Sequence, residues 1–242
     1  MLSKKKKVEI IGIISIYCGI LVMGLFLRDL WTSIQRPPLR TLGETRLWYS
    51  AFIPVIGIIT YHRWKYKWFI VMSLLMAMGF LTVNLLYPET HDQTLMPALQ
   101  SYWFVPHVTV YLFAYSMLGV SAMVSGKGIY DAYRGKLKDD TLKLADNIVH
   151  LGVSFLTLGL LFGAMWAKRA WGHYWTWDPK ETWAFLTWMS YLAYIHFRSS
   201  RPHLRKTAVT MLGCAFIILL LCWFGINYMP SAINSVHTYS KS

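Results

Sequence analysis

Seven mostly apolar runs divide the chain, and each is close to the length that crosses a lipid bilayer. A transmembrane helix needs about 20 mostly apolar residues. The runs cover residues 8–27, 47–61, 68–87, 104–125, 147–167, 183–199 and 207–226. Only 14% of the 242 residues are charged, whereas a soluble domain carries about 25%. The sequence therefore predicts an all-α integral membrane protein with about seven transmembrane helices, forming a single domain over residues 1–242.

The positive charges predict how these helices are oriented. With the N-terminus inside, the inner segments hold sixteen Lys and Arg residues and the outer segments hold eight. Because Lys and Arg accumulate on the cytoplasmic side, the N-terminus is predicted inside and the C-terminus outside. Lys4–Lys7 precede the first run, but no signal-peptide cleavage site follows it, so we expect this run to be a retained span. The longest inner loop, residues 126–146, is expected to be a solvated connector.

The net charge of +13 does not indicate a nucleic-acid-binding protein. Its basic residues are spread over four inner segments and form no single patch, so we expect them to set topology and to contact anionic lipids of the bilayer. The three cysteines, Cys18, Cys214 and Cys222, all lie in apolar stretches, and no C-x-x-C pair is present. This excludes a disulfide framework and a C-x-x-C-H site for covalent haem attachment to this chain.

An outer segment over residues 166–183 holds five of the twelve tryptophans. Asp178-Pro179-Lys180-Glu181 follows the pattern of a helix start, with Asp178 as N-cap and Glu181 completing a capping box. Asp178 could therefore do no more than begin a helix. That cap does not explain the aromatic surface before it. Indole faces beside a helix N-terminus suit a large planar anion, and a porphyrin with two propionates fits that description.

Histidines occur near both predicted membrane faces. His107 and His237 are on the outer side, where two imidazoles from separate segments could hold a haem iron from both faces; each could instead be solvated or lipid-facing. His196 lies 18 residues after Asp178, about 27 Å along the predicted helix. His150 enters the fifth run at a similar depth. Ionisable groups inside spans tend to be functional, although both could also reach the lipid headgroups.

The stretch from Gly163 to Ala184 closely resembles the tryptophan-rich WWD motif of haem-handling membrane proteins, in particular the CcsA (ResC) family of system II cytochrome c maturation. The resemblance covers residues 95–240 well and residues 1–94 only loosely. It implies that His107 and His237 are the axial iron ligands of an outer haem. It also implies that Trp171, Trp175, Trp177 and Asp178 form the platform beneath this haem.

The same resemblance implies that His196 holds haem within a span, while the second histidine for that inner site belongs to a partner subunit, CcsB (ResB). A contribution from His150 is a hypothesis beyond the family pattern. The implied cofactor is haem b, bound non-covalently as a substrate, and the implied recipient is the C-x-x-C-H peptide of apocytochrome c. The resemblance places such a protein in the bacterial inner membrane, with its haem site on the extracytoplasmic side.

The sequence therefore predicts a haem-binding subunit that presents haem for covalent attachment to apocytochrome c. It would belong to a haem lyase complex; no catalytic residue is assigned to this chain, and whether it is itself the enzyme stays open. One alternative is a CcmC-like subunit that passes haem to a haem chaperone. Another is a di-haem cytochrome b-type electron-transfer subunit, which gives no reason for the tryptophans. A small-solute transporter is disfavoured because no paired broken spans are visible.

Overall fold

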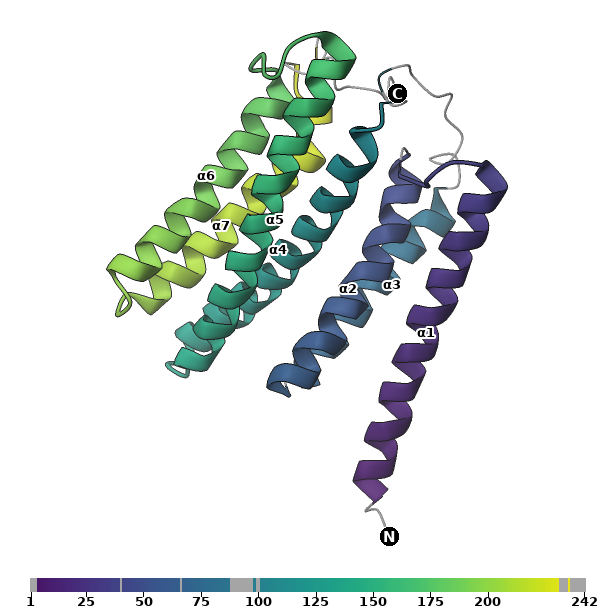
Figure 1. Ribbon diagram of the computed structural model, residues 1–242. Coiled ribbons are helices and arrows are strands. Elements are labelled where there is room, and N and C mark those ends of the chain that lie inside the picture. The colour runs from purple at the N-terminus through teal and green to yellow at the C-terminus, as the bar shows by residue number, and fades with distance from the viewer. Residues whose placement is uncertain are drawn as a thin grey trace. The chain divides into compact units, whose positions relative to one another are not determined.

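The computed structural model describes residues 4–39, 41–65, 67–87, 98, 101–230 and 235, and these residues form helices and no strand. Seven α-helices follow one another along the chain (Figure 1). Their bounds are α1 Lys4–Ile34, α2 Leu42–Trp64, α3 Lys67–Leu86, α4 Phe104–Tyr133, α5 Asp139–Trp171, α6 Pro179–Ser200 and α7 Arg205–Trp223. A short 3-10 helix, Gly225–Tyr228, follows α7. The prediction of an all-α chain with seven long helices is confirmed.

Four of the described helices are long and apolar enough to cross a membrane. These segments are Lys7–Ile34, Phe104–Tyr133, Asp139–Trp171 and Arg205–Trp223. Ile70–Leu86 is a shorter apolar helix. The chain is therefore a multi-pass membrane protein, while the total of seven spans and the orientation stay predictions.

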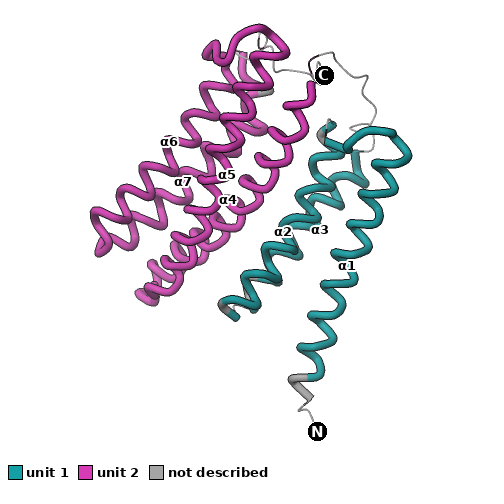
Figure 2. Tube along the Cα trace, viewed as in Figure 1, with its two compact units in different colours: residues 1–95 teal, residues 96–242 magenta. Residues whose placement is uncertain are grey.

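The chain divides into two compact units, residues 1–95 and 96–242 (Figure 2). The predicted single domain is neither confirmed nor excluded by this division. In the first unit, α2 packs against α3, and α1 is tied to both through polar side chains. Glu9 of α1 accepts hydrogen bonds from Tyr61 and from Lys67, the latter over 2.7 Å. Tyr17 of α1 shares a hydrogen bond of 3.0 Å with Nε2 of His62.

The second unit is a bundle of α4 to α7, in which α4 contacts α5 and α7, and α6 contacts the same two helices. Glycines on one face of α5 set its separation from α4. A Cβ added to Gly152 would come within 2.8 Å of Leu118, and one added to Gly159 would come within 2.8 Å of Tyr111. Small residues at such positions let transmembrane helices approach closely. The core of this unit therefore depends on α5 having no side chain at these positions.

Helices continue beyond the predicted apolar runs at two places, for the same physical reason. The expected connector 126–146 is mostly helical, because α4 continues to Tyr133 and α5 begins at Asp139. Likewise, the expected outer segment begins inside α5, which continues to Trp171 and ends where Gly172 adopts a left-handed φ of 86°. The end of an apolar run marks where a helix leaves the hydrocarbon core, not where the helix itself ends. Ala, Lys and Arg are good helix formers in water, so a helix can continue through them until a residue such as Gly stops it.

Candidate functional site

His107 lies in the first turn of α4, and its ring is fixed by a carbonyl group of α5. Its Nδ1 is 2.9 Å from the carbonyl oxygen of Gly159. Because a carbonyl oxygen can only accept, Nδ1 carries the proton, and in the neutral ring the lone pair is on Nε2. Metal-binding histidines usually donate their second ring N–H in this way, which fixes both the tautomer and the ring orientation. The ring of His107 is thus fixed in tautomer and in orientation.

The walls around this imidazole come from α4 and α5. The His107 ring stacks on Trp166 with a centroid separation of 5.3 Å and meets the edge of Tyr111 at 4.8 Å. Gly163 faces the ring so closely that an added Cβ would lie 2.8 Å from Cε1. The half-buried imidazole is therefore held in a slot that Gly163 leaves open, while Gly159, one helical turn earlier, leaves room for Tyr111.

Trp166 connects this histidine to the predicted platform. It is only 4% exposed, and its indole N–H donates to the carbonyl of Ala98 over 2.8 Å. Its ring meets Trp171 edge to face at 4.9 Å. Trp166 is thus a wall behind His107 and not an exposed platform residue. The structure brings His107 and Trp171, two of the predicted site residues, into one aromatic cluster.

Trp175 and Trp177 lie in the short segment between α5 and α6. Their rings meet edge to face at 5.7 Å, and Trp177 makes a similar contact with Phe185. Trp177 is 62% exposed and has a φ of 59°, a left-handed conformation that is rare for a bulky residue. Such strain persists only where the surrounding structure enforces it, and it gathers at functional sites.

Glu181 is the residue that enforces this conformation. Its buried carboxylate accepts from the backbone N–H of Thr176 over 2.7 Å and from that of Asp178 over 3.2 Å. The amides on both sides of Trp177 are thereby anchored, and the hydroxyl of Thr182 donates to the Trp177 carbonyl over 3.1 Å. The exposed indole is consequently presented by a rigid segment.

Asp178 caps α6 as predicted and has a second role that the sequence did not reveal. The capping box with Glu181 is present, and Oδ1 of Asp178 accepts from the backbone N–H of Lys180 over 3.0 Å. The same oxygen accepts from the hydroxyl of Ser235 over 2.8 Å. Ser235 is buried and belongs to the segment after α7, so Asp178 fastens this tail to the start of α6. His237 itself lies outside the described residues.

His196 and His150 lie near the opposite end of the same unit, and both are exposed. Tyr194 and Arg198 of α6 hold Asp146 of α5 through hydrogen bonds of 2.7 and 2.9 Å. Since these residues mark the α5-facing side of α6, His196 lies about 200° round the helix from Tyr194 and faces away from α5. His150 donates its Nδ1–H to the Asp146 carbonyl of its own helix over 2.6 Å. The hypothesis that His150 assists His196 gains no support from this arrangement.

Comparison with known proteins places the chain in a family. Residues 39–234 match the model of the cytochrome c assembly protein family. The chain belongs to this family. Similar proteins include the cytochrome c biogenesis proteins CcsA of Coffea arabica, 29% identical over 95% of this chain and 88% of the relative, and of Cuscuta reflexa, 31% identical over 91% and 83%. CcsA of Solanum bulbocastanum is 28% identical over 95% of this chain and 85% of its own length.

The predicted resemblance to CcsA is therefore confirmed. The sequence reasoning missed several residues that shape the site in this family member. They are the ring contacts Tyr111 and Trp166, the slot residues Gly159 and Gly163, and the tail residue Ser235. Two signals were visible: Gly159 and Gly163 form a G-x-x-x-G pair of the kind that brings helices together, and Trp166 is one of the tryptophans of the segment 166–183.

Proposed function

We propose that this CcsA homologue binds haem b beside the start of α6 and presents it to apocytochrome c for covalent attachment. The observation that carries the proposal is the hydrogen bond from His107 Nδ1 to the Gly159 carbonyl, which puts the lone pair of the neutral ring on Nε2. His107 acts as one axial ligand of the iron. The walls of its slot would hold the imidazole against rotation while haem binds and leaves.

Trp171, Trp175 and Trp177 form the aromatic support for the porphyrin ring in this proposal. Trp177 is exposed and rigidly held, and Trp171 is joined to His107 through Trp166. Asp178 serves this platform indirectly, since its carboxylate is engaged by the helix start and by the tail. We therefore assign Asp178 a positioning role.

The second axial ligand is proposed to be His237. It follows Ser235 by two residues, and Ser235 is fastened to Asp178. Two residues of chain reach at most about 7 Å, and the proposal uses this short reach to bring His237 towards the platform segment. This is the support for pairing His237 with His107 on the two faces of one haem.

His196 is proposed to hold haem at an inner site together with a histidine from a CcsB (ResB) partner subunit. Its exposure and its direction away from α5 suit a ligand that is completed from outside this unit. The excess of positive charge on the predicted inner segments supports an extracytoplasmic haem site. We infer a bacterial inner membrane as its location.

The bonds formed in the reaction join the two haem vinyl groups to the two thiols of a C-x-x-C-H peptide. Both reacting groups belong to the substrates, so the role of this chain is to bind and orient haem and to leave one coordination position to the incoming substrate histidine. No residue of this chain is assigned a catalytic proton transfer. The likeness to CcsA proteins favours direct presentation over transfer to a haem chaperone, and a di-haem electron-transfer protein would not need the platform.

Substitution of the two proposed ligands tests the function. His107→Ala and His237→Ala should each lower the haem content of the purified protein, measured from its Soret absorbance, and abolish cytochrome c assembly. Added imidazole should partly restore both. His173→Ala is the matched control, because His173 is an exposed histidine in the same outer segment. Normal haem content in both ligand variants would refute ligation by this histidine pair.

A further inference from the structure

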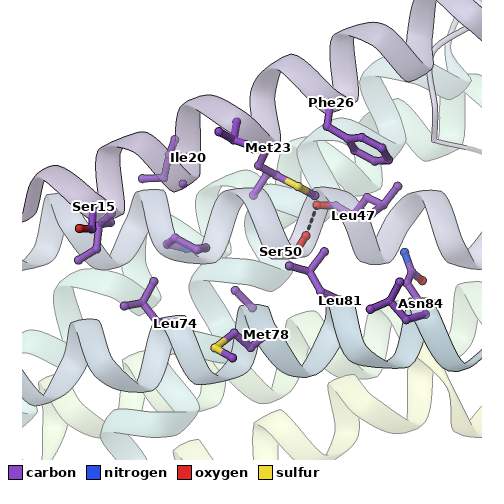
Figure 3. Close-up of a pocket in the computed structure, with 17 residues that line it drawn as sticks. Ser15, Ile20, Met23, Phe26, Leu47, Ser50, Leu74, Met78, Leu81 and Asn84 are labelled. Atoms are coloured by element: carbon purple, nitrogen blue, oxygen red, sulfur yellow. Dashed lines mark hydrogen bonds between the residues drawn. The ribbon is translucent and has the colours of Figure 1, made fainter. Parts of the chain in front are cut away.

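Haem carries two propionate carboxylates, and the two units of the chain differ in what they offer to such an anion. Figure 3 shows the apolar cavity of the first unit, which lies between α1, α2 and α3. None of the described residues that line it is charged, and a buried carboxylate needs a cationic partner. The propionates therefore do not fit there. In the second unit, the segment over residues 166–183 carries three cationic side chains, those of Lys168, Arg169 and Lys180.

The ammonium group of Lys168, in the last turn of α5, is held in place but keeps its charge available. Its Nζ donates to the Gly172 carbonyl over 2.8 Å and lies 5.3 Å from the centre of the Tyr174 ring. The side chain is exposed, and no carboxylate among the described residues pairs with it. An ammonium group has three N–H donors, and the carbonyl uses one. Two donors and a positive charge thus remain for a ligand that arrives from outside.

The carboxylates of the same segment are already engaged elsewhere. Glu181 accepts from two backbone amides of the segment, and Asp178 caps α6 and accepts from Ser235. Lys180 is half-buried, and burial lowers the pKa of its ammonium group, which makes it a weaker partner for an anion. Lys168 is therefore a better candidate for an anion partner than Lys180.

The position of Lys168 on α5 directs it towards the tryptophan segment. Thr157 marks the α6-facing side of α5, because its hydroxyl oxygen accepts from the Trp188 indole N–H over 2.9 Å. At about 100° a residue, Lys168 lies about 20° from Thr157 round the helix, and Trp171 lies about 40° to the other side. Arg169 lies about 120° from Thr157 and points away from α6. Lys168 and Trp171 are therefore neighbours on the side of α5 that faces α6.

We infer that Lys168 binds one propionate of the haem whose ring rests on Trp171. This inference rests on the proposed function and adds to it a residue that sets how haem is turned within its plane. Charge-assisted hydrogen bonds between an ammonium group and a carboxylate are among the stronger polar contacts. The propionates and the vinyl groups lie at opposite edges of the macrocycle. Lys168 therefore turns the vinyl edge away from the end of α5, where the thiols of the substrate peptide can reach it.

A haem with esterified propionates separates this contact from every other contribution to binding. The full-length protein in detergent is titrated with ferric haem and with its dimethyl ester, which lacks both negative charges, and binding is followed by the Soret absorbance. Lys168→Met keeps the length of the side chain and removes its charge. It should weaken haem binding about fourfold, as expected for one exposed ion pair, and leave the affinity for the ester unchanged. Lys168→Arg should restore most of the haem affinity.

Arg169→Met is the matched control, because Arg169 is an exposed cation one residue further along α5 that points away from α6. It should leave both affinities at their wild-type values, and a loss equal to that of Lys168→Met would mean that only the net charge matters. Equal haem affinity of Lys168→Met and the wild type would overturn the inference. An equal loss of haem and ester would also overturn it, since Lys168 would then only stabilise the end of α5. Absence of haem binding by the wild type would instead refute the proposed function itself, so the two failures are distinguishable.

Discussion

The absence of a side chain at Gly163 lets the His107 ring pack against α5, and the substitution Gly163→Ala tests this. In Gly163→Ala the new Cβ would lie 2.8 Å from Cε1 and 2.9 Å from Nδ1 of His107. The ring must shift, which weakens its hydrogen bond to Gly159. We expect haem affinity to fall about fivefold, corresponding to roughly 1 kcal/mol for one hydrogen bond. Gly126→Ala on α4 is the control, since a Cβ there meets no atom within 4 Å. Equal haem affinities of the two variants would show that close packing of Gly163 on His107 is not needed for haem binding.

The buried carboxylate of Glu181 should contribute to the stability of the fold, although Glu181 is not one of the proposed haem ligands. Glu181→Ala leaves the amides of Thr176 and Asp178 without their acceptor and releases the strained backbone of Trp177. We expect the free energy of unfolding to fall by about 2 kcal/mol, measured by detergent denaturation. Glu181→Gln keeps an acceptor oxygen and should lose less. The explanation fails if both variants unfold like the wild type.

Among the elements, the contact between the tail and the start of α6 is the one on which the second ligand depends. Ser235→Ala removes the hydroxyl that donates to Asp178, while the cap of α6 through Lys180 stays intact. We therefore expect normal thermal stability with reduced haem content. Ser190→Ala provides a comparison, because that hydroxyl donates to a carbonyl of its own helix. Wild-type haem content in Ser235→Ala would show that the tail needs no such attachment.

Features set by neighbouring residues could be predicted from the sequence, whereas contacts between residues far apart in the chain could not. The seven helices follow from apolar length, and the start of α6 follows from four consecutive residues, Asp178 to Glu181, because both signals are local. Helix α5 continues past its apolar run to Trp171, because its last turn is polar and only Gly172 marks the stop. The partner of His107 could not be predicted: Gly159 lies 52 residues away, and only packing of α4 on α5 brings them together.

At the scale of the whole molecule, the two units offer different chemistry. The second unit combines a histidine, a rigid tryptophan segment and a tail attachment, which are the parts of the proposed haem site. The first unit contributes an uncharged cavity and no described histidine other than His62.

The side of the membrane on which haem is presented depends on the orientation of the entire chain. Helix α5 has 33 residues and is about 50 Å long, whereas the hydrocarbon core is about 30 Å thick. Its two ends should therefore lie on opposite sides, with the loop containing Lys136 inside and the loop containing His173 outside. Both residues are exposed, so single cysteines at these positions can report the topology.

In a background carrying Cys18→Ala and Cys214→Ala, which removes the exposed native thiols, we expect His173→Cys to react with a membrane-impermeant maleimide in intact cells. Lys136→Cys should react only after the membrane is permeabilised. Cys222 is buried and should stay unlabelled in the folded protein, which the parent without added cysteines checks. The opposite labelling pattern would place the tryptophan segment on the inner face. Because apocytochrome c is proposed to receive haem outside, that result would also require His107 to act in haem loading and not in presentation.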